Sequence, residues 1–221
     1  TTLFRSPAEA NQSVGATWAD YDKDGFPDLF VPNGTGYTNS LFHNEGNGRF
    51  SKTTGIVSSE GGNSVGSCWG DYDNDGDLDL YVTNANSTGN FLYRNDGNGV
   101  FTKITNSVTV TDKGNSHGCS FADIDNDGDL DLYVTNDKLF KFLYLNNGDG
   151  TFSRKNDEII NMNYGNSFGH AWSDFDHDGD LDLAAATHSV QPNGYFINNG
   201  NSNSWLEVNL TGTRSNRSAI G

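Results

Sequence analysis

The stretch Asp71-Tyr72-Asp73-Asn74-Asp75-Gly76-Asp77-Leu78-Asp79 places five carboxylates within nine residues, and its pattern DxDxDGxxD occurs four times in the chain. The copies span residues 20–28, 71–79, 123–131 and 174–182, so their first aspartates lie 51, 52 and 51 residues apart. A fixed period of about 50 residues is typical of solenoids, propellers and other arrays of one repeated unit. The spacing therefore predicts a repeat architecture in which the acidic loop is the most constant part.

Each loop has the composition of a cation site. Carboxylates stand at positions 1, 3, 5 and 9, and a glycine at position 6 permits the sharp turn that wraps a chain around an ion. Two carboxylates ~4 Å apart repel by about 4 kcal/mol at an effective dielectric of 20, so several converging ones indicate a bound cation. Ca²⁺, which takes six to eight oxygen ligands, fits better than Mg²⁺, which prefers a strict octahedron. Zn²⁺ is disfavoured because the loops offer only oxygen apart from His177.

The sequence thus predicts four Ca²⁺ sites. Position 7 varies from Phe26 to aspartate, and a phenylalanine side chain cannot ligate, so we assign this position a backbone-carbonyl role. The predicted ligands are Asp20, Asp22, Asp24, Phe26 and Asp28; Asp71, Asp73, Asp75, Asp77 and Asp79; Asp123, Asp125, Asp127, Asp129 and Asp131; and Asp174, Asp176, Asp178, Asp180 and Asp182.

The EF-hand loop begins with the same pattern but needs a bidentate Glu at position 12 and flanking helices. Position 12 here is Val31, Val82, Val134 or Ala185. Residues 78–83 alternate apolar and polar side chains with period two, which indicates a strand. The loops are therefore expected in β-hairpins.

Each repeat has the same internal order. A strand with an aromatic residue two positions before the loop, expected to pack between neighbouring sheets, is followed by the loop, a second strand and a variable polar segment. An aromatic third strand, a turn of the form N-x-G-[N/D]-G and a fourth strand starting at Phe50, Phe101 or Phe152 complete it. Four antiparallel strands in about 50 residues form the blade of a β-propeller, so the predicted fold class is all-β, a β-propeller of four-stranded antiparallel blades.

The expected division of the chain follows from these repeats. Residues 1–12 end a preceding blade, residues 13–62, 63–114, 115–165 and 166–203 form the four calcium-loop blades, and residues 204–221 form a closing strand or further segment. The fourth repeat departs from the others because Ser202 replaces the second glycine of the turn and Ser204 replaces the aromatic. Its outer strand is expected over residues 205–210 instead.

The loops and the LFxNxGxGxF strand-turn-strand motif together resemble the FG-GAP/VCBS repeat family, the integrin-α-like β-propellers, over residues 13–198. Residues 205–221 resemble the opening of the ASPIC/UnbV segment that follows such repeats in the cartilage-acidic-protein group. The resemblance implies a seven-bladed propeller, of which this chain would be a fragment. The missing blades of such a fragment would be supplied by absent sequence or by a neighbouring chain. The alternative is that the four blades close with help.

Composition narrows the function classes. The net charge is −16, and 19 of the 29 acidic residues lie in the four loops, so bound Ca²⁺ would reduce the charge to about −8. No basic patch offsets this charge, which disfavours nucleic acid as a partner. The sequence has no apolar run long enough for membrane insertion. The chain begins at Thr1 without methionine or signal peptide, and we interpret it as a processed or excised piece of a longer protein.

Cys68 and Cys119 lie at offsets −3 and −4 from their loops, which places them on opposite faces of equivalent strands. Two small buried thiols are favoured over a disulfide. Loops with Ca²⁺ affinities of ~10⁻⁴–10⁻³ M suit the extracellular medium, so a secreted or cell-surface location is expected. Sequons that allow glycosylation begin at Asn11, Asn33, Asn86, Asn209 and Asn216.

Three functions remain open. The resemblance implies an extracellular scaffold for binding or adhesion to a protein, matrix or glycan ligand, with structural calcium on one face and ligands on the other. Candidate recognition residues are Tyr37, Asn86, Lys138, Phe140, Tyr164 and Gln191. A lectin with one sugar site per blade is the alternative, using recurring amides such as Asn63, Asn115 and Asn166. An enzyme is less favoured because His43, His117, His170, His177 and His188 belong to no recognised catalytic motif.

Overall fold

The computed structural model describes residues 12–137, 140–156, 166–188 and 193–200, and these form antiparallel sheets in which strand order follows chain order. Blade 1 is β1 (Thr17–Ala19), β2 (Asp28–Val31), β3 (Ser40–Asn44) and β4 (Phe50–Lys52). Blade 2 is β5 (Ser64–Gly70), β6 (Asp79–Asn84), β7 (Phe91–Asn95) and β8 (Phe101–Ile104). Blade 3 is β9 (Ser116–Ala122), β10 (Asp131–Asn136), β11 (Phe142–Asn146) and β12 (Phe152–Lys155). Blade 4 has three described strands, β13 (Asn166–Ser173), β14 (Asp182–His188) and β15 (Gly194–Phe196).

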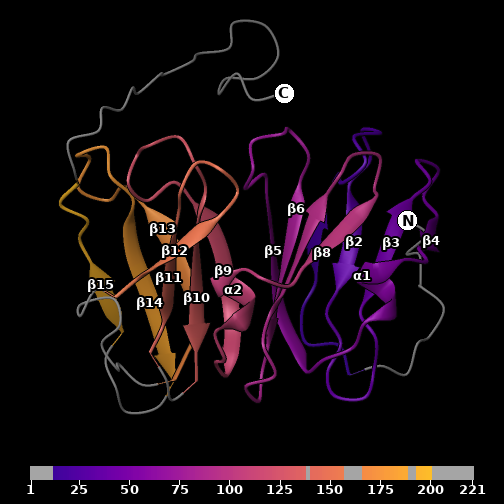
Figure 1. The fold of residues 1–221 in the computed structure, drawn as a ribbon, viewed down its shortest axis with the longest axis horizontal. Helices are drawn as coiled ribbons and strands as arrows, with labels where there is room; N and C mark the ends of the chain where they lie inside the picture. The colour runs from indigo at the N-terminus through magenta and orange to yellow at the C-terminus, as the bar shows by residue number, and fades with distance from the viewer. Residues whose placement is uncertain (1–11, 138–139, 157–165, 189–192, 201–221) are drawn as a thin grey trace, which may run out of the picture.

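The predicted all-β, propeller-type architecture is confirmed by these sheets. The first strands β1, β5, β9 and β13 pack side by side in succession. Figure 1 shows the blades standing in chain order, from indigo blade 1 to orange and yellow blade 4 at the other end of the row. The expected closing strand over residues 205–210, Ser202, Ser204 and the segment 205–221 lie outside the described residues, as do residues 1–11.

The hydrophobic core lies between blades rather than within them. All residues of β6 and of β10 are buried, both reading Asp-Leu-Tyr-Val-Thr-Asn, because each face of these second strands packs on a neighbouring blade. The three apolar clusters correspond to the three interfaces between successive blades. Tyr81, for example, is fully buried in the cluster that also contains Leu132 and Tyr144 of blade 3. Each fully buried side chain of this size contributes about 1.5–3 kcal/mol to the free energy of unfolding. Because these side chains are buried between blades, a single blade has little core of its own.

Close approach of the first strands requires glycine. A Cβ atom on Gly66 would lie 2.2 Å from the carbonyl oxygen of His117 in the next blade, and one on Gly118 would lie 2.7 Å from that of Phe168. Real Cβ contacts do not reach such distances, so any side chain here would push the strands apart. This explains the glycine in the first strands of blades 2 and 3, whereas a Cβ atom on Gly15 or Gly169 would meet no atom closer than 3.6 Å.

The aromatic residue before the loop packs between sheets in blades 2 and 4, as expected. Trp69 stacks on Tyr21 of blade 1 with ring centroids 6.3 Å apart, and its indole N–H donates to Thr17 Oγ1 at 3.1 Å. Trp172 likewise donates to Ser120 Oγ of blade 3 at 2.9 Å. Each of these tryptophans thus makes a hydrogen bond in addition to its apolar contact. The hydrogen bond contributes about 1 kcal/mol net to the free energy of unfolding. In blade 1 the equivalent tryptophan is largely exposed, because no described blade precedes it.

The two cysteines meet across the interface of blades 2 and 3. Cys68 pairs with Tyr81 in the ladder, and Cys119 Sγ lies 3.9 Å from the carbonyl oxygen of Tyr81. The sequence predicted that the cysteines occupy opposite faces of equivalent strands. It did not predict their contact, which arises because one face of blade 2 packs on the opposite face of blade 3. Both cysteines are free, and as whole residues they are half-buried rather than buried. Burial of the thiol, with the adjacent Cys119 thiol as a second cause, raises the pKa of Cys68 well above its usual value.

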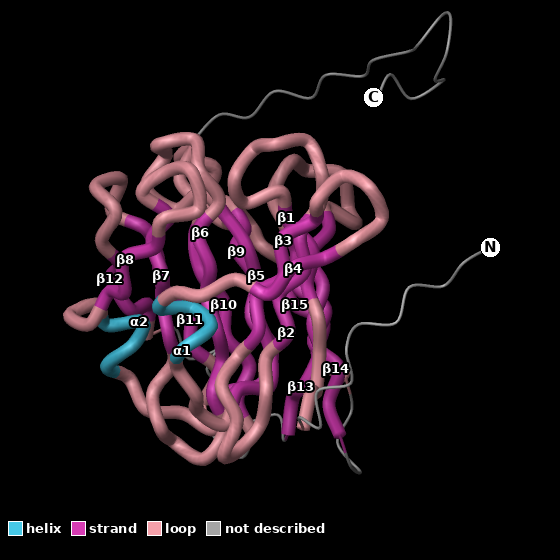
Figure 2. The backbone as a smooth tube through the Cα atoms, turned by 90° about the vertical axis from the view of Figure 1, so that its right-hand side faces the viewer, coloured by secondary structure: helices cyan, strands magenta, loops and turns pink. Residues whose placement is uncertain are grey.

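Two single-turn helices, which the sequence analysis did not predict, connect the blades. They are α1 (Ile56–Ser59) and α2 (Val108–Thr111), and Figure 2 shows both on the same outer side of the sheets. Ser107 caps α2 by accepting a hydrogen bond from the backbone N–H of Thr109 at 3.3 Å. The Tyr81 hydroxyl donates to the carbonyl of Thr109 at 2.6 Å, which ties this helix to the core of blade 2.

Candidate metal-binding site

The four acidic loops join the first and second strands of each blade and share one backbone conformation. Their glycines, Gly25, Gly76, Gly128 and Gly179, have φ between 90° and 95°. The residue at position 4 is also left-handed, with φ of 58° at Asn74 and 64° at His177. Such backbone favours glycine strongly and asparagine moderately, which accounts for the constant glycine at position 6 and for the asparagine at position 4 of the second and third loops.

Two carboxylates of each loop are held by the loop's own backbone. In the second loop, Asp71 accepts hydrogen bonds from the N–H groups of Asp75 and Gly76 at 3.1 and 2.9 Å. Asp75 accepts one from Asp77 at 2.8 Å. The same bonds recur in the other three loops. The oxygens at positions 1 and 5 are therefore preorganised rather than free to separate.

The carboxylate at position 3 points inward, toward the others. Among the described residues, Oδ1 of Asp22 and Oδ1 of Asp73 are buried without a hydrogen-bond partner. In every loop at least three carboxylates bring ligand atoms within 4.8 Å of one another: Asp20, Asp22 and Asp24; Asp71, Asp73 and Asp79; Asp123, Asp125 and Asp127; and Asp174, Asp176 and Asp182. A buried oxygen without a donor beside other carboxylates is unfavourable unless a cation completes it, so the predicted ligand sets fit a hard divalent ion.

The carboxylate at position 9 is the most deeply buried member. Asp79 is fully buried and accepts two backbone N–H groups, from Tyr72 at 3.0 Å and from Asn95 at 2.8 Å. Burial raises its pKa to about 8, and the nearby Asp73 carboxylate adds to the shift. Asp131 has equivalent contacts, and burial raises its pKa to about 7. A cation in the loop would offset this cost of burying charge.

The first three loops are each also bound by the following blade. The side-chain amide of Asn95, in the turn of blade 2, donates to the carbonyl of Tyr21 in the first loop at 2.7 Å. The equivalent turn residues, Asn146 and Asn198, donate to the second and third loops at 2.7 and 2.8 Å. The turn N-x-G-[N/D]-G is therefore part of the loop structure of the preceding blade, a role that the sequence analysis did not foresee.

A second set of contacts joins position 4 of one loop to position 7 of the next. Lys23 pairs with Asp77 at 2.7 Å, and Asn74 donates to Asp129 at 2.5 Å. Asn126 Nδ2 donates to Asp180 Oδ1 at 2.6 Å. These side chains at position 7 are engaged by the neighbouring blade, which agrees with assigning the carbonyl, rather than the side chain, to an ion.

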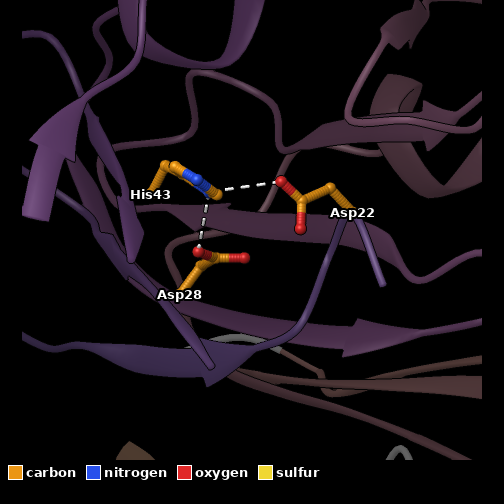
Figure 3. Close-up of side chains that lie close together, drawn as sticks. All are labelled: Asp22, Asp28 and His43. Carbon is orange, nitrogen blue, oxygen red and sulfur yellow. Dashed lines mark ion pairs between the residues drawn. The ribbon is translucent and has the colours of Figure 1, made fainter. Parts of the chain in front are cut away.

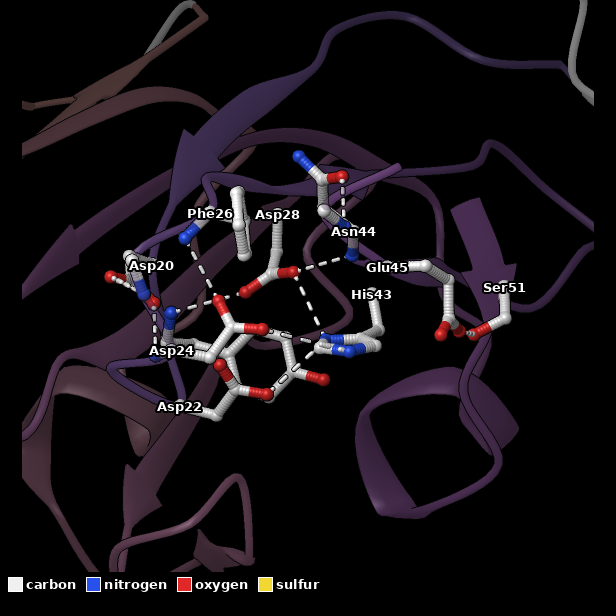
Figure 4. Close-up of polar contacts among 12 residues, drawn as sticks. Asp20, Asp22, Asp24, Phe26, Asp28, His43, Asn44, Glu45 and Ser51 are labelled. Carbon is white, nitrogen blue, oxygen red and sulfur yellow. Dashed lines mark hydrogen bonds and ion pairs between the residues drawn. The ribbon is translucent and has the colours of Figure 1, made fainter. Parts of the chain in front are cut away.

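His43 reaches the first loop from β3, and the sequence analysis did not place it there. Its Nδ1 lies 3.2 Å from Asp22 Oδ2 and 3.3 Å from Asp28 Oδ1 (Figure 3), and its Nε2 lies 3.8 Å from Asp24 Oδ2. Figure 4 shows the imidazole facing the carboxylates, beside the backbone N–H that Asn44 donates to Asp28. The sequence could have indicated this contact, because His43 immediately precedes Asn44, the turn asparagine whose backbone N–H donates to the loop carboxylate of Asp28.

The other histidines have different surroundings. His170 Nε2 lies 2.6 Å from Ser120 Oγ, and burial lowers the pKa of this imidazole to about 4, so it is neutral. Ser120 Oγ also accepts a hydrogen bond from the indole N–H of Trp172. His170, Ser120 and Trp172 therefore form a hydrogen-bonded chain between blades 3 and 4. Nδ1 of His170 has no hydrogen-bond partner in the described part of the chain, so no carboxylate orients the ring as in a hydrolytic triad. His177 is exposed, as expected.

The opposite end of the blades is held by buried amides. Asn33, Asn84 and Asn136 are fully buried, and Asn84 Nδ2 donates to the carbonyl of Gly89 at 2.8 Å. Asn33 therefore does not present a glycosylation site in the folded protein, which corrects that expectation. Of the other sequons, Asn86 is exposed, whereas Asn11, Asn209 and Asn216 lie outside the described residues.

The candidate recognition residues lie partly at this same end. Tyr37 is 37 % exposed and Phe140 is 57 % exposed, and both flank loops between second and third strands. Lys138, Tyr164 and Gln191 lie outside the described residues, and of His188 only the backbone is described. The described residues thus place apolar side chains in solvent at the end of the blades that carries no acidic loop.

Successive antiparallel blades that each carry an acidic hairpin loop define a repeat protein of the β-propeller type. The chain belongs to the family of FG-GAP-like repeats, whose family model matches residues 20–82, 79–134 and 141–185. It is similar to cartilage acidic protein 1 of Mus musculus, with 29% identity over 195 residues, 82% of this chain and 30% of that protein. It is also similar to cartilage acidic protein 1 of Homo sapiens, with 28% identity over 204 residues, 82% of this chain and 29% of that protein. The chain therefore spans less than a third of the length of these relatives.

Within the described residues, no helix is long and apolar enough to cross a membrane.

Proposed function

We propose that this chain is a calcium-stabilised extracellular repeat scaffold that binds a protein, matrix or glycan ligand. The observation that carries the proposal is the set of preorganised acidic loops at the junctions of successive blades, with buried Asp22 and Asp73 oxygens that lack a donor. Calcium would neutralise each loop and so fix the contacts that join the blades. In this role the ion is structural.

The expected energies are consistent with that role. At ~1–2 mM Ca²⁺ and a Kd of ~10⁻⁴ M, each site adds about 1.5 kcal/mol to the free energy of unfolding. Four such sites would add about 6 kcal/mol, which is comparable to the whole stability of many domains. Sites of this affinity fill outside cells, which supports a secreted or cell-surface location. The relatives are named for cartilage and for acidity, and both words fit an acidic protein of the extracellular matrix.

Ligand binding is assigned to the end of the blades away from the acidic loops. The exposed Tyr37, Asn86 and Phe140 lie in or beside the variable loops there, and aromatic side chains are frequent anchors in protein and sugar recognition. Additional blades, from more of the same chain or from a neighbouring chain, would complete a closed propeller. A glycan array would separate a lectin from a protein-binding scaffold, since a lectin would select particular sugars.

Calcium counting tests the metal part directly. We expect four Ca²⁺ per chain by equilibrium dialysis, and a large loss of melting temperature when a chelator replaces about 2 mM Ca²⁺. Asp73→Asn should remove one ion and about 1.5 kcal/mol of the calcium-dependent stability. The matched control is Asp149→Asn, because Asp149 is exposed and accepts hydrogen bonds from Thr151 outside the loops. An unchanged melt on chelation, or an equal effect of both variants, would contradict the proposal.

A further inference from the structure

An aromatic side chain from the fourth strand packs at the interface of blades 1 and 2 and again at that of blades 2 and 3. Phe101 of blade 2 contacts Tyr21 and Trp69, with ring centroids 5.7 and 6.3 Å away. Phe152 of blade 3 contacts Tyr72 of blade 2, with ring centroids 5.5 Å apart. Each of these fourth strands thus delivers one phenylalanine ring to the preceding blade.

The interface of blades 3 and 4 has an open cavity of about 330 Å³ at the corresponding place. Its apolar lining includes Ile124, Leu143, Leu145, Trp172, Leu183 and Phe196. Ile124 and Trp172 occupy the positions that Tyr21 and Trp69 have around Phe101. A cavity of ~150 Å³ lined by such side chains accommodates benzene, so an aromatic ring has room here. The apolar cluster at this interface, as far as the structure describes it, contains no fourth-strand residue of blade 4.

The chain turns beside this cavity in the same way as in the other blades. The backbone N–H of Gly200 donates to the side-chain oxygen of Asn198 at 3.2 Å, and the same bond measures 3.1 Å in the turns of blades 2 and 3. Gly200 has φ of 68° and itself lines the cavity. The turn of blade 4 therefore begins the reversal that leads to the fourth strand in blades 2 and 3.

The sequence after Gly200 offers one aromatic side chain, Trp205, within reach of the cavity. Phe101 and Phe152 stand six residues after their turn asparagines, whereas blade 4 has Ser204 at six residues and Trp205 at seven. One extra residue in the turn would bring the tryptophan to the phenylalanine position. An extended chain covers ~3.3–3.6 Å per residue, so the five residues from Gly200 to Trp205 span up to about 17 Å.

Residue sizes on the two sides of this interface are complementary. In the turn of blade 2, a Cβ atom on Gly99 would lie 2.6 Å from the ring of Tyr21. The third loop has the smaller Ile124 in place of this tyrosine. The repeat that follows it has Ser202 in place of the glycine and a tryptophan near the phenylalanine position. Larger residues in blade 4 thus accompany a smaller residue in blade 3.

We propose that the segment after Gly200 docks on its own blade and places the indole of Trp205 in this cavity. Trp205 then does for blades 3 and 4 what Phe101 does for blades 1 and 2. In the described sheet β15 pairs with β14 alone, so the docked segment would also cover an open strand edge. The inference goes beyond the proposed function, because no metal ion enters it.

Fluorine NMR of the intact chain labelled with fluorotryptophan tests this docking. The chain has four tryptophans, and Trp205→Phe identifies the signal of Trp205 while keeping an aromatic ring. We expect this signal to move little between H2O and D2O, whereas the signal of Trp18, which is 58 % exposed, should move far more. A solvent shift of Trp205 as large as that of Trp18 would overturn the proposal.

A pair of alanine variants locates the ring. Leu145→Ala removes part of the cavity wall and should displace the Trp205 signal. Val100→Ala is the matched control, because Val100 is an exposed apolar residue in the turn of blade 2. This control should leave the Trp205 signal in place. A Trp205 signal that Leu145→Ala does not move, or that both variants move equally, would contradict the docking.

Two further measurements distinguish other occupants of the cavity. Protection of Trp205 should be the same at low and high protein concentration, and protection found only in dimers would assign the cavity to a second copy of the chain instead. Trp205→Ala should bind the apolar dye anilinonaphthalene sulfonate more strongly than wild type and Trp205→Phe do. Strong dye binding by wild type would show that the cavity is open to apolar ligands, which would overturn the proposal.

Discussion

Replacing Asn95 by alanine isolates the contact that joins blade 2 to the first loop. The side chain is fully buried, and its amide donates to Tyr21 O at 2.7 Å and to Leu78 O at 3.2 Å, while its oxygen accepts from Gly97 at 3.1 Å. Three such hydrogen bonds at about 1 kcal/mol each give an expected loss of about 3 kcal/mol in the free energy of unfolding. Urea unfolding in saturating Ca²⁺ measures this loss, and an unchanged m-value would show that the unfolding transition is otherwise the same.

Asn44→Ala is the internal control for this measurement. Asn44 occupies the same place in the turn of blade 1, but its amide donates to Pro27 O at 3.0 Å in an exposed position, and it makes no cross-blade bond within the described residues. We expect a loss of about 1 kcal/mol for this variant. Equal losses for the two variants would refute the reasoning, because the difference of about 2 kcal/mol is assigned to the buried bonds that include the one between blades.

Three further outcomes follow from the geometry. Because burial raises the pKa of Asp79 to about 8 from 3.8, the stability of the metal-free protein should fall as pH rises from about 4 to 8, and urea unfolding at about pH 5 and pH 8 in chelator checks it. Stability that instead rises over this range would contradict it. Gly76→Ala should lower the free energy of unfolding by about 1–2 kcal/mol in thermal unfolding, because Gly76 has φ of 92°. The control Gly55→Ala should lower it little, because Gly55 is extended and a Cβ atom there would have no atom within 4 Å. Trp172→Phe should cost about 1 kcal/mol through its hydrogen bond to Ser120, and a double-mutant cycle with Ser120→Ala should recover that coupling or disprove it.

The repeat and its blades were predictable because the carboxylates of a loop are close in sequence. Carboxylates at fixed positions around Gly76 determine a local turn, and the alternation after it determines a strand, so no distant contact is needed to recognise either. The ladder between β5 and β6 has the expected hairpin arrangement, in which Asp79 stands opposite Gly70 at the ends of the loop.

What the sequence did not reveal are the relations between blades. The period shows that Cys68 and Cys119 are on opposite faces, but which faces meet depends on how whole sheets pack. The approach of His43 to Asp22 is likewise a matter of tertiary structure, since it joins the third strand of a blade to its first loop through the pairing of the strand between them. One-turn helices such as α2 escape detection because a short connection has no periodic pattern.

The clasp between Asn95 and the Tyr21 carbonyl has a consequence for biosynthesis. The two residues are 74 positions apart in the chain, so a ribosome adding ~5–20 residues per second finishes the first loop several seconds before its partner emerges. During that interval the loop has its carboxylates but not the amide that fixes it. A nascent blade would therefore reach its final structure one step behind synthesis, since each new turn completes the acidic loop of the blade before it.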